Sequence, residues 1–569
     1  MGNWLRRRRW LILGWAFLAG VVGVQGLYAG FLNRSYYASL GPFYDSVSYL
    51  NRLAEIMWIA REQGVAAALR GATAPANVML PYLEAALLGV LLAPSRILAI
   101  WLQEVWILAL ACSLLWYLHR LRGVPLLAAT AFTLPFFNFA TVYWHSGGVS
   151  DFRMDLSLYI FLAMSAVWYL STYETRAAYP WVLTAVAALS AVLARATAGA
   201  YLVMMFGPLL AARLASTSGE ERGQLVKRLL WAGVPCMAAC AAYYLTRWDY
   251  LHWYYFVWGQ DPTAHLPFLK AARHFWFGLH HLGNALKLAA GVTLLLTLGA
   301  AVRADGWPAA GRRLDLRLVW LGAAPGALLA AMGAGPNRLV SMPMVFGVLL
   351  FCLMPLRGRH PLRRHPFTAG LCAILLAGAS LVNAALGVER HRYFSGRGGE
   401  MAAFRQAIDL LRSDARRHGL EEARVVSTTI HDFATPFLEN TLIYEHGGRP
   451  EHGTVVLPDG FRVNFSRQWS FAPVVPLDWE RIPGGSDEEK FHYLVALASR
   501  ELDYIFLPDL PTIDYLEQRK AGNFQNLKVR RLRRMLLASG RWEPVGEPIV
   551  VTPGEETLTL YRKRSGGAE

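Results

Sequence analysis

Asp45 is an acidic residue in a position where it could do proton chemistry. It lies about a dozen residues after a strongly apolar run, directly behind Tyr44 and ahead of the amphipathic stretch "SVSYLNRLAEI". A carboxylate can take the proton of a hydroxyl group, and ionisable groups at the edge of hydrocarbon are costly and so are functional candidates. We predict that Asp45 is catalytic and that Tyr44 contributes to substrate binding; the alternative is that Asp45 only caps the following helix.

A second charged stretch is "YWHSGGVSDFRMDLSLYIFL", which contains His145, Asp151, Arg153 and Asp155. The two acids are four residues apart, so they share one face of a helix that starts early. We predict that Asp155 is catalytic and that the other three bind substrate. Alternatively, Asp151 caps the helix and Arg153 forms an ion pair that ties loops together.

Basic residues at other helix ends could hold a phosphate group. The candidates are Arg195 in "LARATAGAYL", Arg338 in "GPNRLV", and Lys270 and Arg273 in "LPFLKAARHFWF". Arginine suits this task because its planar fork donates two parallel hydrogen bonds to phosphate oxygens. The alternative for each is a basic side chain that extends from a helix end to the membrane interface.

The composition of the chain sets the environment of these residues. Of 569 residues, 54% are hydrophobic and 17% are charged, and apolar runs of close to twenty residues recur. These values are typical of an integral membrane protein. The net charge of +16 comes largely from short basic loops between apolar runs, which set membrane orientation, so we predict no nucleic-acid partner.

Eleven apolar runs are long enough to suggest transmembrane helices. They cover residues 10–31, 101–118, 124–143, 156–171, 180–196, 198–214, 230–246, 283–302, 317–333, 339–356 and 367–387. If the Arg6–Arg9 cluster is cytoplasmic, nearly every short basic loop falls on the cytoplasmic side. The pattern therefore predicts a multi-pass protein of the inner (plasma) membrane with a cytoplasmic N-terminus.

One further apolar run, residues 77–94, does not fit this alternation. As a full span it would carry Glu84 into the bilayer and place the later basic loops outside. We therefore assign about 46–94 to helices that lie along the outer membrane face.

The C-terminal part of the chain, 388–569, is polar and alternates helical patterns with short β-like runs such as "ARVVSTTI" and "DYIFLP". It is long enough to bury a core of its own. We predict a membrane domain over 1–387 and a periplasmic or extracellular α/β domain over 388–569.

The first outer loop with its acid, the Arg153-x-Asp155 motif before the fourth span, and "GPNRLVSMP" before a later span resemble the GT-C superfamily of polyprenyl-phosphate-sugar-dependent glycosyltransferases. The membrane region is similar to that of protein O-mannosyltransferases and lipid A aminoarabinose transferases. This resemblance implies a GT-C-like fold and gives Asp45 the role of catalytic base or acceptor-orienting acid. Ser46 stands where the family often has a second acid, so a paired-carboxylate metal site is not supported and a divalent metal stays an open alternative.

The resemblance implies an inverting glycosyltransferase that uses a polyprenyl-phosphate sugar donor. Its acceptor would be an envelope lipid, glycan or protein on the non-cytoplasmic side, and membrane lipids would surround it. Two alternatives remain open: a flippase or transporter of lipid-linked glycans, and a polymerase or ligase that uses a pyrophosphate-linked donor. The lack of an obvious repeated half speaks against transport.

Overall fold

The computed structural model describes most of the chain. The described residues are 2–39, 45–73, 78–144, 148, 152, 154–252, 267–333, 341–395, 400–427, 435–451, 453–465, 482–509, 513, 524–552 and 556–564. The chain divides into two compact units. The membrane unit comprises Met1–Leu32, Thr73–Leu83 and Ile97–His391, and the C-terminal unit comprises Asn33–Ala72, Glu84–Arg96 and Arg392–Glu569.

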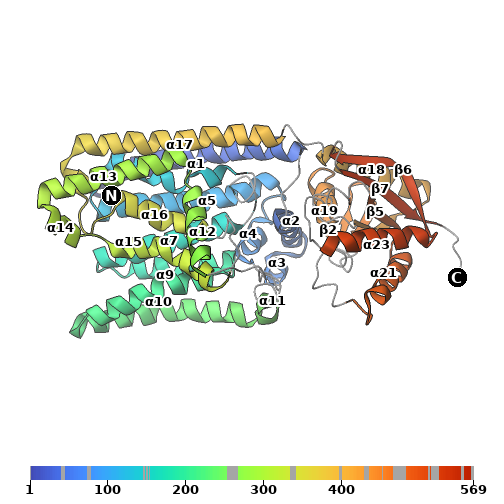
Figure 1. The fold of residues 1–569 in the computed structure, drawn as a ribbon, viewed down its shortest axis with the longest axis horizontal. Coiled ribbons are helices and arrows are strands. Elements are labelled where there is room, and N and C mark those ends of the chain that lie inside the picture. Colours follow the sequence, from blue (N-terminus) through green and yellow to red (C-terminus); the bar gives the residue numbers. More distant parts are fainter. Residues whose placement is uncertain are drawn as a thin grey trace. The chain divides into compact units, whose positions relative to one another are not determined.

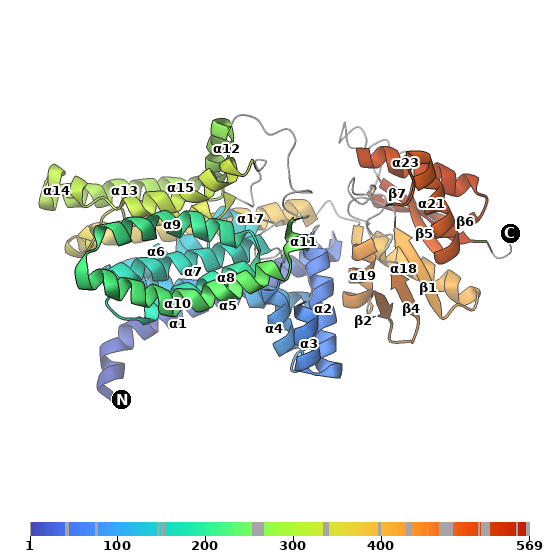
Figure 2. The same cartoon turned by 90° about the horizontal axis from the view of Figure 1, so that it is seen from below.

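The membrane unit is a bundle of apolar helices (Figures 1 and 2). Its longer helices are α1 (Gly2–Ser39), α5 (Arg96–Leu115), α7 (Met154–Glu174), α8 (Tyr179–Ala194), α9 (Ala198–Ser216), α10 (Gly219–Leu245), α12 (Pro267–His280), α13 (Asn284–Asp305), α15 (Leu316–Ala331), α16 (Met344–Leu353) and α17 (Pro366–Ser395). Shorter helices are η1 (Trp116–Leu121), α6 (Leu126–Thr133), η2 (Leu134–Phe136), η3 (Ala140–Tyr143), α11 (Trp248–His252), α14 (Trp307–Arg312) and η6 (Pro361–Arg364). Helix α4 (Leu80–Leu88) begins in the membrane unit and ends in the C-terminal unit.

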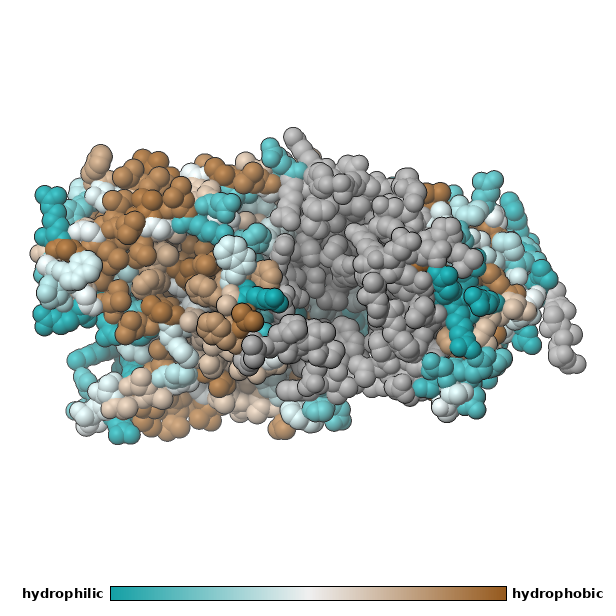
Figure 3. All heavy atoms as spheres, in the orientation of Figure 1, coloured by the Kyte–Doolittle hydropathy of each residue, from teal (hydrophilic) through white to brown (hydrophobic). Residues whose placement is uncertain are grey.

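The helix lengths agree with the predicted spans. Within the described residues, seven helices are long and apolar enough to cross a membrane, and four more apolar helices have 10–17 residues. Each of the eleven predicted runs coincides with one of these helices. Hydrophobic side chains cover much of the visible face of the bundle (Figure 3). The protein is therefore a multi-pass membrane protein, as predicted.

The run at 77–94 does not form a span. Its helix α4 has nine residues, less than half the length that hydrocarbon requires. It is preceded by α2 (Asp45–Gln63) and α3 (Val65–Ala72), which pack against each other in the C-terminal unit.

The C-terminal unit contains a seven-stranded mixed sheet in the order β2-β3-β4-β1-β5-β7-β6. Its strands are β1 (Glu422–Ser427), β2 (Arg449–Glu451), β3 (Thr454–Val456), β4 (Arg462–Phe465), β5 (Tyr504–Pro508), β6 (Trp542–Thr552) and β7 (Glu556–Lys563). Strand β1 pairs in parallel with β4 and β5, and the other pairs are antiparallel.

Helices cover both faces of this sheet. They are α18 (Glu400–Arg417), α19 (Thr435–Tyr444), α21 (Asp487–Glu501) and α23 (Phe524–Ala538). Val425 and Phe506 point into the core with α18 and α19, whereas Val426 and Ile505 point into the core with α21 and α23. This alternation follows from the two-residue period of a strand, whose side chains are apolar on both faces here. The predicted fold class, a polytopic helical membrane protein with a C-terminal α/β domain, is confirmed.

Candidate functional site

A buried ion pair lies where α7 begins and α8 ends. Arg195 Nη1 donates to Asp155 Oδ1, and the two side chains are 15% and 2% exposed. Asp155 is in the first turn of α7, where a carboxylate also interacts favourably with the helix dipole. Arg195 is the extended residue that ends α8. Two of the residues predicted from the sequence are thus brought together across 40 positions of chain.

The turn that carries Arg195 is held in place by α10. The Tyr244 hydroxyl donates to the carbonyl of Ala196 and accepts the backbone N–H of Gly199 at 3.1 Å. A Cβ on Gly199 would lie 2.3 Å from that hydroxyl oxygen, so only glycine permits this close approach. Arg195 is therefore presented by a turn whose position is fixed by neighbouring helices.

A second buried polar group centres on His281, directly after α12. Its Nδ1 lies 2.5 Å from Thr141 Oγ1, and its Nε2 lies 3.1 Å from Ser341 Oγ. The ring of Trp144 also packs against it in a tilted arrangement, with the centroids 5.7 Å apart. Thr141 and Trp144 come just before the predicted residue His145, and Ser341 follows closely after the predicted residue Arg338. His281 therefore connects Thr141 and Trp144 with Ser341.

Asn383 on α17 supports the same region. Its amide donates to the carbonyls of Asn138, at 3.2 Å, and Leu282, at 3.0 Å. Sequence reasoning missed both His281 and Asn383. A polar residue inside an apolar span, such as Asn383, is the signal that could have identified one of them.

Lys270 and Arg273 lie on α12, but only Lys270 is buried. Lys270 Nζ donates to the carbonyl of Gly333 at 2.9 Å, just beyond the C-terminal end of α15. A cation at this position satisfies a free carbonyl and complements the helix dipole. The observed contact of Lys270 is thus a structural one, and Arg273 is exposed on its helix.

Arg247, which follows α10, was not selected from the sequence. It is buried, donates to the carbonyl of Thr73 at 2.6 Å and lies 4.7 Å from the ring centroid of Tyr243. Because it is a buried guanidinium at the same end of the helices as Arg195, it is a further candidate to bind an anion. Its hydrogen bond to Thr73 also fixes the backbone at this residue.

Asp45 is the first residue of α2, but its side chain lies outside the described residues. The predicted residues Tyr44, His145, Asp151, Arg153 and Arg338 lie outside them as well. Within the described part of the chain, no group of three or more His, Cys, Asp and Glu side chains is arranged to hold a metal ion.

The helix that Asp45 begins is anchored within the C-terminal unit. Asn51 donates to Glu439 Oε2 at 3.1 Å and accepts from the Asn440 amide at 2.7 Å. The Tyr444 hydroxyl donates to the carbonyl of Leu50 at 2.9 Å. Three polar contacts from α19 therefore hold the second turn of α2, at Leu50 and Asn51.

Comparisons with known proteins give similar solved structures but no sequence family. No family model matches the chain, and no curated protein matches it. The chain is similar to a cryo-EM structure of arabinofuranosyltransferase AftD from Mycobacteria, with a TM-score of 0.46 and 16% sequence identity. The match covers 99% of this chain and 40% of the AftD chain, so this chain spans less than half the length of that protein.

Proposed function

We propose that the protein is an integral-membrane, inverting glycosyltransferase of the GT-C type. It would move a sugar from a polyprenyl-phosphate donor to an envelope lipid, glycan or protein on the non-cytoplasmic side of the inner membrane. The observation that carries this proposal is the buried Asp155–Arg195 pair at helix ends that the basic-loop pattern assigns to the outer side. The sequence resemblance described above supports the same reaction class.

In the proposed reaction, Asp45 takes the proton of the acceptor hydroxyl. The acceptor oxygen bonds to the anomeric carbon while the bond from that carbon to the phosphate oxygen breaks, and the lipid phosphate leaves with the electron pair. Attack on the face opposite the phosphate inverts the anomeric centre. A positioned carboxylate lowers the barrier because it accepts the proton as the new bond forms.

Positive charge is needed where the phosphate leaves. Arg195 and Arg338 are proposed to bind it, with Lys270 and Arg273 as secondary candidates. Asp155 is proposed to act through Arg195, because its carboxylate accepts the hydrogen bond that orients the guanidinium. Tyr44, His145, Asp151 and Arg153 are proposed to contact the substrates, and no metal is required by this scheme.

The arrangement in the membrane is part of the proposal. The N-terminus would be cytoplasmic, the residues about 46–94 would lie at the outer face, and the domain 388–569 would be periplasmic or extracellular. The distribution of basic loops supports this orientation.

The test is sugar transfer by the purified protein in sealed proteoliposomes. Radiolabelled sugars on polyprenyl phosphate and on polyprenyl pyrophosphate are supplied separately, with envelope extract as acceptor. We expect transfer from the monophosphate donor, with inverted configuration in the product. Transfer only from the pyrophosphate would indicate the polymerase or ligase, and movement of an intact lipid-linked glycan without a new glycosidic bond would indicate the flippase.

A further inference from the structure

A basic cavity of about 490 Å³ lies at the other end of the membrane unit, where α13 ends and α17 begins. Figures 1 and 2 show α14 at this end of the membrane unit, and α11, which follows α10, at the opposite end. The cavity is lined by four arginines and one carboxylate, together with His360, Ala304 and Pro361; the charged residues are Asp305, Arg313, Arg359, Arg363 and Arg364. Nothing in the proposed transfer reaction uses these residues.

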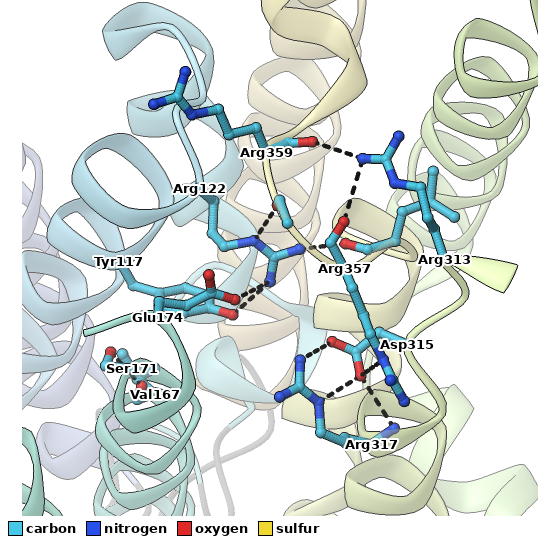
Figure 4. Close-up of polar contacts among 12 residues, drawn as sticks. Tyr117, Arg122, Val167, Ser171, Glu174, Arg313, Asp315, Arg317, Arg357 and Arg359 are labelled. Carbon is cyan, nitrogen blue, oxygen red and sulfur yellow. Dashed lines mark hydrogen bonds and ion pairs between the residues drawn. The ribbon is translucent and has the colours of Figure 1, made fainter. Parts of the chain in front are cut away.

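The wall of this cavity is built on a buried arginine (Figure 4). Arg122 is fully buried, and its guanidinium donates to the carbonyl of Gly358 at 2.8 Å, to the carbonyl of Leu356, and to the Tyr117 hydroxyl at 2.7 Å. Its own carbonyl accepts the N–H of His360 at 2.9 Å. Because a buried cation is costly unless its donors are satisfied, these bonds fix the backbone of the loop between α16 and η6.

The strand-like segment before α15 holds the same loop from the other side. Arg313 donates to the carbonyls of Arg357, at 3.2 Å, and Arg359, at 3.1 Å (Figure 4). Arg313 also pairs with Asp305. The fully buried Asp315 accepts from Arg317 at 2.7 Å, and its N–H donates to a loop carbonyl at 2.8 Å. The cavity is therefore preformed, and Asp305 is already neutralised by Arg313.

Three arginines around the cavity have no acidic partner among the described residues. Among the described residues, no carboxylate forms an ion pair with Arg359, Arg363 or Arg364, and all three side chains are exposed. Three guanidinium groups around one preformed cavity repel each other unless an anion lies between them. Phosphate oxygens match the paired N–H donors of arginine.

An apolar stripe begins directly beside the cavity. Helix α17 starts at Pro366, and Phe367, Leu371 and Ile374 lie on one face of it, with Phe367 86% and Ile374 72% exposed. On the other side, Trp307 of α14 is also exposed. A free phosphate ion gains no binding energy from an apolar surface, whereas the acyl chains of a lipid can lie along it.

We propose that this cavity binds the phosphate headgroup of an anionic phospholipid, whose acyl chains lie along the α17 stripe. The basic-loop pattern assigns this end of the bundle to the cytoplasmic side, where anionic headgroups attract clustered arginines. The site is distinct from the proposed transfer site and does not depend on it.

The test is native mass spectrometry of the full-length protein in detergent with added phosphatidylglycerol or cardiolipin. Arg363→Gln/Arg364→Gln removes two charges from the cavity, and Arg222→Gln/Lys227→Gln removes two charges from the exposed surface of α10 as a matched control. We expect the cavity variant to bind anionic lipid about tenfold more weakly or worse, and the control to bind like the wild type. Both arginine side chains that are altered are exposed, and an unchanged melting temperature without lipid would confirm that the variant folds. Arg359→Gln provides a second, independent cavity variant.

Three results would overturn the proposal. One is equal lipid binding by the wild type and both cavity variants, and another is an equal loss in the control variant, which would indicate general surface attraction. The third comes from inorganic phosphate, added instead of lipid. If phosphate alone raises the melting temperature of the wild type as much as the lipid does, and not that of the cavity variant, the ligand is a free anion.

Discussion

At the Asp155–Arg195 pair, two opposite charges share a site that water hardly reaches. Removing one member of a buried pair is costly, because the other charge stays in a medium of low dielectric constant. We predict that Asp155→Asn lowers the free energy of unfolding by about 3 kcal/mol. The measurement is thermal unfolding of the purified protein in detergent, followed by intrinsic tryptophan fluorescence.

The double variant Asp155→Asn/Arg195→Gln serves as the control for this prediction. It should lose clearly less stability than the sum of the two single changes, because it leaves no buried charge of either sign at this pair. Simple additivity of the two losses would contradict the account, since it would mean that the side chains contribute independently.

A second prediction at the residue scale concerns how His360 makes the stability of the protein depend on pH. Burial, with smaller contributions from the positive charges of Arg122 and Arg313, lowers the pKa of this histidine to about 4, against the opposing effect of the hydrogen bond to Leu353. Leu362 N–H donates to Nδ1, so Nε2 carries the proton that reaches the Leu353 carbonyl. The folded state therefore holds a neutral imidazole.

The sign of the effect follows from proton binding. Between pH 6.5 and 4 the unfolded chain binds a proton at His360 and the folded chain does not, so stability is complete above pH 6.5 and falls as the pH drops toward 4. The loss is on the order of 3 kcal/mol. We expect the difference in melting temperature between pH 7 and pH 4.5 to shrink in His360→Gln, and the same difference in both proteins would contradict this role.

Individual site residues were only partly predictable. Asp155 was selected because an ionisable group at the edge of hydrocarbon is costly, and Arg195 because a guanidinium suits a phosphate. Their pairing joins two helices and has no signature in the local sequence. Arg122 illustrates the limit more strongly. In "HRLRG" it is typical of a basic topology signal, and its burial depends on carbonyls more than 230 positions away along the chain.

At the scale of elements, a testable prediction concerns the packing of the turn between α8 and α9. Gly199→Ala would place a methyl group against the Tyr244 ring and hydroxyl, and we predict a loss of about 1–3 kcal/mol in the free energy of unfolding. Gly207 lies in the same helix with nothing within 4 Å of its missing Cβ. Gly207→Ala should therefore be neutral or stabilising by up to about 1 kcal/mol.

A second comparison separates crowding from a general helix effect. In the background Tyr244→Phe, which lacks the hydroxyl, Gly199→Ala should cost clearly less. Equal costs in the two backgrounds, or equal effects of Gly199→Ala and Gly207→Ala, would show that the close approach to Tyr244 does not limit this turn. Melting temperatures in detergent are again the measurement.

Elements with a long sequence pattern could be predicted, whereas short elements could not. Apolar runs of close to twenty residues identified the spans, and the Ser486–Glu489 capping box marks the start of α21. The strands β1 and β5 coincide with the predicted β-like runs "ARVVSTTI" and "DYIFLP". Strands β2, β3 and β4 were missed because they have three or four residues each, too few to show an alternating pattern.

For the whole molecule, the orientation in the membrane is the first claim to test. We predict that a cysteine at Arg500, in the C-terminal unit, reacts with a membrane-impermeant maleimide added to intact spheroplasts. A cysteine at Arg222, on α10, should react only after permeabilisation, because the basic loops are expected to face the cytoplasm. Both side chains are exposed, so accessibility reports on the side of the membrane. Labelling of both positions from the same side would contradict the predicted topology.

The grouping of α2 and α3 with the C-terminal segment was not visible in the sequence. Asn51 and Asn440 meet across 389 positions, and neither residue belongs to a recognisable motif. Long-range contacts of this kind depend on the complete fold and leave no local signal. The consequence for the proposed reaction is that the helix beginning at Asp45 is held by the C-terminal unit.

The central claim is that Asp45 is the catalytic base, and one substitution tests it most directly. Asp45→Asn keeps the size of the side chain but removes its ability to accept a proton, so sugar transfer from a polyprenyl-phosphate donor should fall by ~100-fold or more. Glu62→Gln removes an exposed carboxylate from the last turn of the same helix and should retain wild-type turnover. With both variants monodisperse and equally stable, wild-type turnover by Asp45→Asn would contradict the proposed mechanism.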